Sequence, residues 1–267
     1  MNQVASAKAI LRRPYVFLTR LLFDPLLFDP LPVFRKWEGL PFFLRNLLAY
    51  RRLNRGGAFA FRFRDSIYRS YDRFSSAAEL PAHYFYQDVW AARFLYENGV
   101  KDHVDVGSRV DGFVAHVLPF CRVRHVDVRP LDVEWNGFEF VRGSVTQLPF
   151  ADDSVPSLSC LHVIEHIGLG RYGDLVDPSG HLHAARELAR VLQRGGMLLV
   201  GTPVGRERLC FDAHRVFDPQ TIVDIFQRLS LVEFCLIDDR GRGINRGVSF
   251  DEARRCDYGC GLFVFTK

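Results

Sequence analysis

The residues best suited to ligand chemistry lie in one stretch, HVDVGSRVDGF, residues 103–113. Its first four residues predict a buried strand, Gly107 the tight turn that leaves the strand, and Gly112 the start of a helix. Glycine lets the backbone approach a ligand closely, and a helix start offers unpaired N–H groups to a carboxylate or phosphate. Asp105, at the strand's end, can accept hydrogen bonds from hydroxyl or ammonium groups. The stretch predicts a site for a nucleotide-like ligand, with an ordinary α/β turn as the alternative.

A second acidic strand end strengthens the ligand interpretation. RHVDV, residues 124–128, predicts the next strand, and its Asp127 stands 22 positions beyond Asp105. In doubly wound folds, an acid at the end of the second strand holds the hydroxyls of a nucleotide's ribose. The two acids together favour a ligand site over an ordinary turn.

Strand and helix patterns alternate along the remaining chain. The seven predicted strands are residues 103–106, 124–128, 138–141, 158–163, 197–200, 231–237 and 261–265, and helices are predicted from Gly112, over 181–192 and after Asp218. This alternation predicts an α/β fold, a three-layer sandwich around a seven-stranded, mostly parallel sheet. The second and third strands are joined by only about nine residues, which is short for a parallel crossover. Either a helix is reduced to a loop there or the strand order differs.

Charge is distributed unevenly. Residues 1–56 carry ten Lys or Arg against three acidic residues, about +7, whereas the rest of the chain sums to −3. Nucleic-acid binding by the body is therefore not indicated. Apolar residues at helical spacing over 11–22, and a second apolar and basic segment over 40–53, suit an arm lying on an anionic membrane surface. The alternative is a helical lid that packs on the main domain or on a partner.

These patterns divide the chain into a basic amphipathic arm over 1–56, a helical prelude or cap over 57–102, and an α/β domain over 103–267, with a hinge at residues 55–57. No run of about 18 apolar residues occurs, and Arg residues interrupt the start of the chain where a signal peptide would be apolar. We predict a cytoplasmic protein without a membrane-spanning helix, which meets the inner face of the membrane through its arm.

Metal-ligand patterns are weak in this sequence. His162, Glu165 and His166 spell H-x-x-E-H, the inverted zinc-protease motif, but that motif needs a helix and here ends a strand-like run. Cys256 and Cys260 lack a second pair of ligands nearby. We therefore predict no metal site, and we expect the six cysteines to be core residues in a reducing compartment.

Several motifs, taken in order, resemble class I S-adenosylmethionine-dependent methyltransferases of the type-11 group. They are VDVG (104–107), VDVRP (126–130), GSVTQLPFADDSV (143–155), LHVIEHI (161–167) and RVLQRGGMLLVGTPVG (190–205). The likeness covers residues 103–267. SRVDGF (108–113), GRYGDLVDPSGHL (170–182) and DAHRVF (212–217) are similar to an uncharacterised methyltransferase-like branch.

The resemblance implies S-adenosylmethionine as cofactor and a set of residues around it. The expected cofactor-binding residues are Asp105, Gly107, Ser108, Arg109, Gly112, Asp127, Ser144, Val145 and Cys160. The chain departs from the family where Arg109 and Asp111 replace glycines of the turn and where Ser144 replaces the acid that meets adenine. Pro156 also stands where the fourth strand usually opens with Asp. Arg109 then either reaches the cofactor's carboxylate or fills the pocket.

If the cofactor binds, the reaction is displacement at a sulfonium methyl, helped by a general base that removes the acceptor's proton. The expected catalytic residues are His166, His214 and Glu165, and the expected substrate residues are Asp177, His181 and Arg215, the last as a clamp for an anionic acceptor. The predicted function is O-methylation of a saccharide or lipid-linked glycan. The alternative is a catalytically degenerate module that binds a partner or a membrane.

Overall fold

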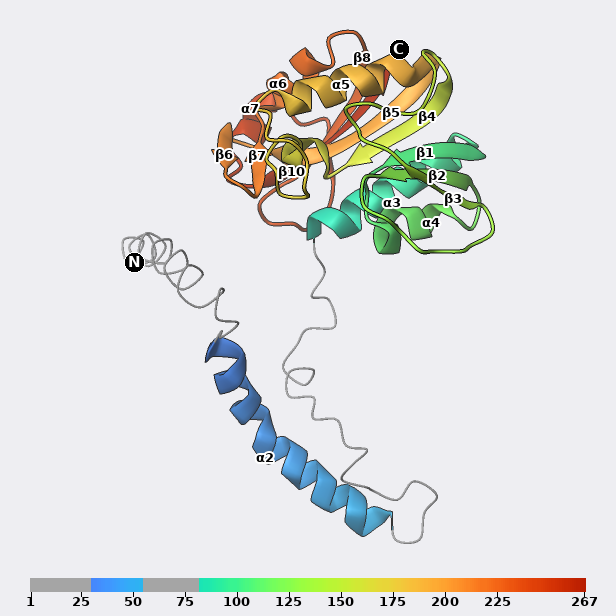
Figure 1. Cartoon of the computed structure of the whole chain (residues 1–267). Coiled ribbons are helices and arrows are strands. Elements are labelled where there is room, and N and C mark those ends of the chain that lie inside the picture. The colour runs from blue at the N-terminus through green and yellow to red at the C-terminus, as the bar shows by residue number, and fades with distance from the viewer. Residues whose placement is uncertain (1–29, 55–81) are drawn as a thin grey trace. The chain divides into compact units, whose positions relative to one another are not determined.

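The computed structural model describes residues 30–54 and 82–267 (Figure 1). The chain divides into two compact units, residues 1–79 and 80–267. The predicted helix over 11–22 and the predicted hinge at 55–57 lie outside the described residues. Within the described ranges, no helix is both long enough and apolar enough to cross a membrane.

The described part of the first unit is one helix, α2, Pro30–Leu53. Proline suits its first position because the fixed φ angle is helical and the missing N–H would be unpaired there in any case. Arg51 and Arg52 occupy the last turn, where cations interact favourably with the helix dipole. Leu48 and Leu53 are exposed on the same helix, so this segment combines solvent-facing apolar and basic side chains.

The second unit is built on an eight-stranded sheet in the order β3-β2-β1-β4-β5-β10-β8-β9. Its strands are β1 Asp102–Val106, β2 Arg122–Asp127, β3 Phe138–Arg142, β4 Val155–Leu161, β5 Leu192–Val204, β8 Ser230–Ile237, β9 Asn245–Arg246 and β10 Gly259–Thr266. The first five strands pair in parallel, and β10 runs antiparallel to both β5 and β8. The predicted seven-stranded, mostly parallel sheet is confirmed, with β9 as a short additional edge strand.

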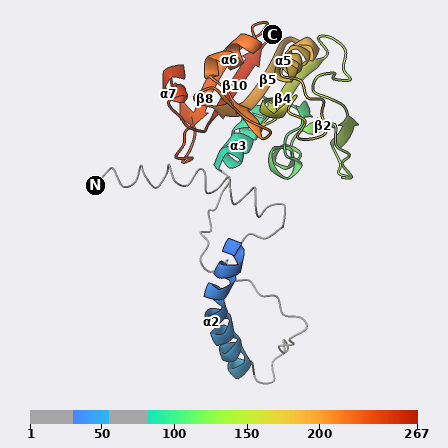
Figure 2. The same cartoon turned by 60° about the vertical axis from the view of Figure 1, so that its left-hand side comes forward.

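Helices cover both faces of this sheet (Figures 1 and 2). They are α3 Ala82–Glu97, a π-helical turn Val110–Val114, α4 Ala115–Val117, a 3-10 turn Ile164–His166, α5 Gly180–Val191, α6 Pro219–Ile225 and α7 Phe250–Arg254. Outside the main sheet, β6 Arg208–Cys210 pairs with β7 His214–Val216 in a small hairpin. The α5 and α6 helices lie on one side and α3 and α4 on the other. The three-layer sandwich is therefore confirmed.

Two apolar cores, one on each face, hold the layers together. In β10, Phe263 and Phe265 pack with α5 and α6, whereas Leu262 and Val264 pack with α3. Successive side chains of a strand point to opposite faces, and an interior strand of a covered sheet is apolar on both. Burial of each such side chain contributes about 1.5–3 kcal/mol, so the run of apolar residues in β10 explains its place inside the sheet.

Three local expectations are decided by the structure. The β2–β3 connection is a loop without a helix, and β3 pairs in parallel with β2. The helix after the glycine turn does not begin at Gly112, which has φ −107° and ψ −106° inside the π-helical turn, where the Asp88 side chain occupies the place of a Cβ. The fourth strand ends at Leu161 because His162 has a left-handed backbone with φ +54°.

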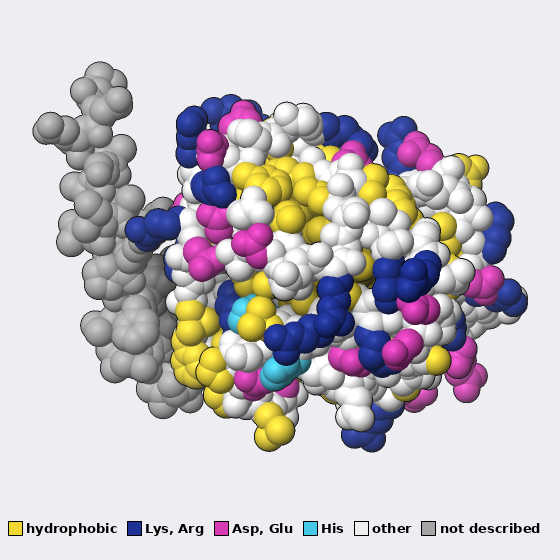
Figure 3. Space-filling model, turned by 90° about the horizontal axis from the view of Figure 1, so that it is seen from above, with side chains coloured by type: hydrophobic (Ala, Val, Ile, Leu, Met, Phe, Trp, Pro, Cys, Tyr) yellow, Lys and Arg dark blue, Asp and Glu magenta, His cyan; other side chains and the backbone are white. Residues whose placement is uncertain are grey.

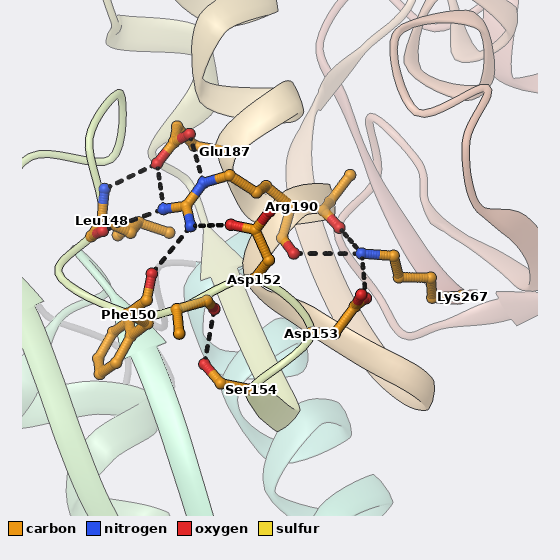
Figure 4. Close-up of polar contacts among 10 residues, drawn as sticks. Leu148, Phe150, Asp152, Asp153, Ser154, Glu187, Arg190 and Lys267 are labelled. Atoms are coloured by element: carbon orange, nitrogen blue, oxygen red, sulfur yellow. Dashed lines mark hydrogen bonds and ion pairs between the residues drawn. The ribbon is translucent and has the colours of Figure 1, made fainter.

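Arg190, near the end of α5, fastens the polar loop that precedes β4 (Figure 4). Its guanidinium donates to the carbonyls of Leu148 at 3.1 Å and Phe150 at 2.9 Å. It also pairs with Asp152 at 2.7 Å and with Glu187 at 2.8 Å. Because four partners bind the one planar guanidinium group of Arg190, the segment that links β3 to β4 is held in place.

The surface of the second unit carries mixed charge. On the face drawn in Figure 3, Lys and Arg side chains are interspersed with Asp and Glu. A nucleic-acid-binding face carries a stripe of one sign, so this face resembles an ordinary solvated surface.

Candidate functional site

A cavity of about 690 Å³ opens at the carboxyl ends of β1, β2, β3 and β4. Ligands of open α/β sheets bind at this position. Six of the predicted site residues line it: Gly107, Asp127, Ser144, Val145, His166 and Asp177. The sequence motifs that were expected to meet around a ligand therefore contribute to one cavity.

Gly107 forms the floor of the cavity where β1 ends. Its φ is +72°, and a Cβ at this position would lie 3.0 Å from Cγ2 of Val163. Both the backbone angle and the contact favour glycine. The turn thus brings backbone, without a side chain, to the cavity surface.

Asp105 is fully buried beneath the turn and does not line the cavity. Its carboxylate accepts hydrogen bonds from Ser108 Oγ at 2.5 Å and Ser159 Oγ at 2.6 Å, and it pairs with His125 Nδ1 at 2.8 Å. Burial opposes its charge, but these bonds hold the pKa of Asp105 below its ordinary value. Asp105 and Ser108 therefore shape the turn, and neither is oriented toward the cavity.

Asp127, at the tip of β2, lines the cavity but is already engaged. Arg129 donates its backbone N–H at 2.8 Å and its side chain at 3.0 and 2.7 Å to the two carboxylate oxygens. The Arg129 guanidinium also lies 5.0 Å from the centre of the Tyr172 ring. Although burial opposes it, this bonding keeps the pKa of Asp127 below its ordinary value. A ligand hydroxyl at this carboxylate would compete with Arg129.

Arg109 does not fill the cavity. Its guanidinium pairs with Asp111 at 2.7 Å, lies 5.2 Å from the centre of the Tyr84 ring, and is absent from the cavity lining. Gly112 is likewise outside the lining, where it makes room for Asp88. The two charged residues that depart from the family pattern therefore bond to each other at the surface.

The wall formed after β3 contains Ser144 and Val145. The Ser144 hydroxyl lies 2.8 Å from that of Thr146, and Val145 is buried. Cys160, which was expected at the cofactor, lies in the core within β4 and does not reach the cavity. Burial raises its pKa well above the ordinary value, so its thiol stays neutral.

His166 is the titratable group best arranged for proton transfer. Its Nδ1 lies 2.6 Å from the carbonyl oxygen of Ala213. A carbonyl only accepts, so Nδ1 carries the proton and Nε2 is left with a lone pair. Burial lowers the pKa of His166, which favours the neutral ring. This ring on the cavity wall can accept a proton.

Glu165 is buried next to His166 and does not line the cavity. Burial raises the pKa of Glu165 to about 8, and Thr202 Oγ1 donates to it at 3.3 Å. Its carboxyl oxygen is 3.7 Å from Nε2 of His166, which exceeds hydrogen-bond distance. At neutral pH Glu165 is therefore a protonated neighbour of the histidine.

His214 and Arg215 lie on β7, behind the cavity wall. The His214 ring lies 6.4 Å from that of His166 and 5.2 Å from that of Tyr258. Arg215 donates to the carbonyl of Ile167 at 2.7 Å. Neither side chain lines the cavity, and Arg215, which was expected to clamp a substrate, instead fixes the segment that carries His166.

Asp177 and His181 flank the start of α5. Asp177 lines the cavity and pairs with His183 Nδ1 at 2.9 Å. His181 lies outside the lining, beside the Phe217 ring at 5.8 Å. The substrate residues predicted from sequence are therefore separated, with only Asp177 at the cavity.

Sequence reasoning missed several cavity residues: Arg129, His162, Tyr172, Asp174 and His183. His162 was considered only as part of a zinc-protease motif. A signal for Tyr172 and Asp174 was available, because both lie in the distinctive segment 170–182, and Arg129 lies in the VDVRP motif at the end of a predicted strand.

Comparison with known proteins supports the fold. The profile of a family described as "Caenorhabditis protein of unknown function, DUF268" matches residues 150–235. The N-methyltransferase NodS from Bradyrhizobium japonicum, solved with S-adenosyl-l-homocysteine, is similar at 19% identity over 70% of this chain and 88% of that one, with a TM-score of 0.50. The [4+2]-cyclase SpnF is similar at 15% identity over 79% of this chain and 88% of that one, with a TM-score of 0.51. No curated protein matches the chain in sequence.

Proposed function

We propose that the chain is an S-adenosylmethionine-dependent methyltransferase that acts on a hydroxyl of a saccharide or lipid-linked glycan. The observation that carries this proposal is the cavity at the ends of β1 to β4, with a side-chain-free turn at Gly107 and a carboxylate at Asp127. Its volume lies within the roughly 300–1,000 Å³ of small-molecule sites. These residues fit an adenosine-bearing ligand. Asp127 would face the ribose hydroxyls, and the Gly107 turn would lie against the amino-acid part of S-adenosylmethionine.

Bound S-adenosylmethionine would supply an electrophilic methyl group. The protein's own part would be to hold the acceptor and to take its proton at Nε2 of His166. The neutral, Nδ1-protonated ring supports this role, because a base must be unprotonated before it acts.

Other residues of the cavity lining support a saccharide as the acceptor. Asp174, Asp177 and His183 provide hydrogen-bonding groups there, and Tyr172 provides an aromatic face. Carboxylates accept hydrogen bonds from hydroxyls, and a flat ring can cover the apolar face of a sugar. The exposed apolar and basic side chains of α2 support a lipid-linked form of the acceptor.

A calorimetric titration of the full-length protein with S-adenosylmethionine and with S-adenosylhomocysteine tests the cofactor. We expect one site per chain for both, and no heat change at millimolar ligand contradicts the proposal. With a saccharide acceptor found by screening for methyl transfer, His166→Gln should lower the rate about 10²–10⁴-fold without changing cofactor affinity. His181→Gln, a histidine outside the cavity lining, is the matched control and should retain most of the rate.

The arm has its own test. Full-length protein should float with liposomes that contain anionic lipid, and a chain that starts near residue 57 should not. Equal partitioning of the two removes membrane association from the proposal and leaves the cofactor result untouched.

A non-catalytic binding module is the second candidate, and one observation favours it. Arg129 satisfies both oxygens of Asp127, so the carboxylate is occupied by the chain's own cation. Binding of neither cofactor form, together with an intact fold by circular dichroism, is the result expected of such a module.

A further inference from the structure

Three possible metal ligands converge beside the cavity from elements that are far apart in sequence. They are His83 in the first turn of α3, His162 after β4, and Cys260 in β10. One ligand atom from each lies within 4.8 Å of the other two. A tetrahedral ion bonded at about 2.0–2.3 Å to nitrogen and sulfur brings its ligands to similar separations after a small adjustment.

His162 provides the observation that points to a ligand. Its Nδ1 is buried and has no hydrogen-bond partner among the described residues. Its backbone has φ +54°, an uncommon angle for a residue other than glycine, and its N–H is held by the carbonyl of Gly201 at 2.7 Å. Buried polar atoms in folded proteins are nearly always partnered.

The other two groups make only local contacts. The Cys260 thiol is fully buried, lies 3.9 Å from the Gly261 carbonyl and meets the backbone of Thr202. The His83 ring is half-buried, stacks on Tyr258 at 5.2 Å and hydrogen-bonds to the backbone of that residue, which leaves its other ring nitrogen for an ion. The stacking orients His83, and its partial exposure leaves a route for an ion to enter.

We propose that His83, His162 and Cys260 form a binding site for one zinc ion, with a fourth position open to water or to a cavity ligand. Three protein ligands with one open position are characteristic of catalytic rather than structural zinc. Binding displaces the thiol proton: the S–H bond breaks, a Zn–S bond forms, and one proton is released to solvent.

This site differs from both patterns in the sequence that suggested zinc. Of H-x-x-E-H only His162 belongs to the cluster of converging ligand atoms. Of the Cys256 and Cys260 pair only Cys260 takes part. The ligands come from three separate elements, so no local motif could predict them.

Metal-free full-length protein titrated with Co²⁺ tests the site. We expect one equivalent to bind, with an intense near-ultraviolet thiolate-to-cobalt charge-transfer band that Zn²⁺ abolishes by competition, and with release of one proton per ion. Cys260→Ser should lose the band, whereas Cys256→Ser, a buried thiol outside the cluster, should retain it. His83→Gln should keep the band and weaken binding at least about tenfold, the lower end of the loss that disturbed metal sites show.

A band that survives Cys260→Ser or disappears in Cys256→Ser overturns the proposal, as does failure to bind one equivalent. If Cys260→Ser does not fold, His83→Gln decides the question, because His83 is only half-buried; unchanged affinity then overturns the proposal. The titration contains no S-adenosylmethionine, so its outcome is separate from that of the proposed methyltransferase activity.

Discussion

The two halves of the cavity wall treat their polar groups differently. On the β1–β2 side, the carboxylate of Asp127 in the wall and that of Asp105 buried beneath the turn are bonded by the chain itself, through Arg129 and through Ser108 and His125. On the side that follows β4, one ring nitrogen, Nδ1 of His162, has no partner among the described residues. Bonded groups hold a shape, whereas groups with free lone pairs can exchange protons or bind ions. The first side therefore holds the shape of the turn, and the second side offers a nitrogen that is free to bind a proton or an ion.

The largest expected effect comes from breaking the support beneath the turn. Asp105→Asn removes the negative partner of His125 inside the core and should lower the free energy of unfolding by about 3–5 kcal/mol, as measured by urea denaturation. Asp111→Asn, which breaks only the exposed pair with Arg109, is the control and should cost less than about 1 kcal/mol. Equal effects of the two would mean that Asp105 is not a support.

The next effect concerns Asp127, where support and ligand binding compete. Asp127→Asn should weaken S-adenosylmethionine binding by about 10–100-fold, because a charged acceptor bond is worth about 1.5–3 kcal/mol. Arg129→Gln frees the carboxylate and should instead tighten binding a few-fold. Calorimetry measures the affinities of both variants. Weaker binding in Arg129→Gln would show that Arg129 contacts the ligand and does not compete with it.

The smallest effect is a pH dependence from the buried pair. Burial opposes the charge of His125, but its bond to Asp105 raises the pKa of His125 above the ordinary value. The stabilisation from this histidine is complete below its unfolded pKa of about 6.5 and is lost as the pH rises through its folded value. The stabilisation from Asp105, whose pKa is lowered in the folded state, is present above about pH 4 and is lost as the pH falls.

Between these limits the pair stabilises the fold. The stability difference between wild type and His125→Gln should therefore be largest near pH 5–6 and should shrink as the pH rises through the folded-state pKa of His125. Urea denaturation across this range measures the difference, and a difference that stays constant with pH would show that the two groups do not form an ion pair.

The fold was predictable where periodicity decides structure. The apolar runs predicted the mostly parallel sheet, because each buried strand of a covered parallel sheet is apolar on both faces, whereas the order of the strands came only from the structure. The turn at Gly107 followed from residue type alone. What periodicity misses is local competition, as at Gly112, where Asp88 from another helix occupies the space beside the backbone.

The site was predictable only in part, because side-chain partners are not encoded in local patterns. The tips of β2 and β3 and His166 were found from strand ends. Arg215 was misplaced as a substrate clamp because its partners are backbone carbonyls such as that of Ile167. His83 could not be connected with Cys260 before the sheet placed β10 beside β5.

The order of the strands in the sheet also constrains how the protein is made. β8 joins the parallel half only through β10, which is translated after it. A nascent chain that has emerged only as far as residue 245 therefore presents the edge of β5 and an unattached β8, both apolar, to the surrounding medium. Ribosome-associated chaperones, rather than the finished fold, would have to shield these edges until residues 259–266 arrive.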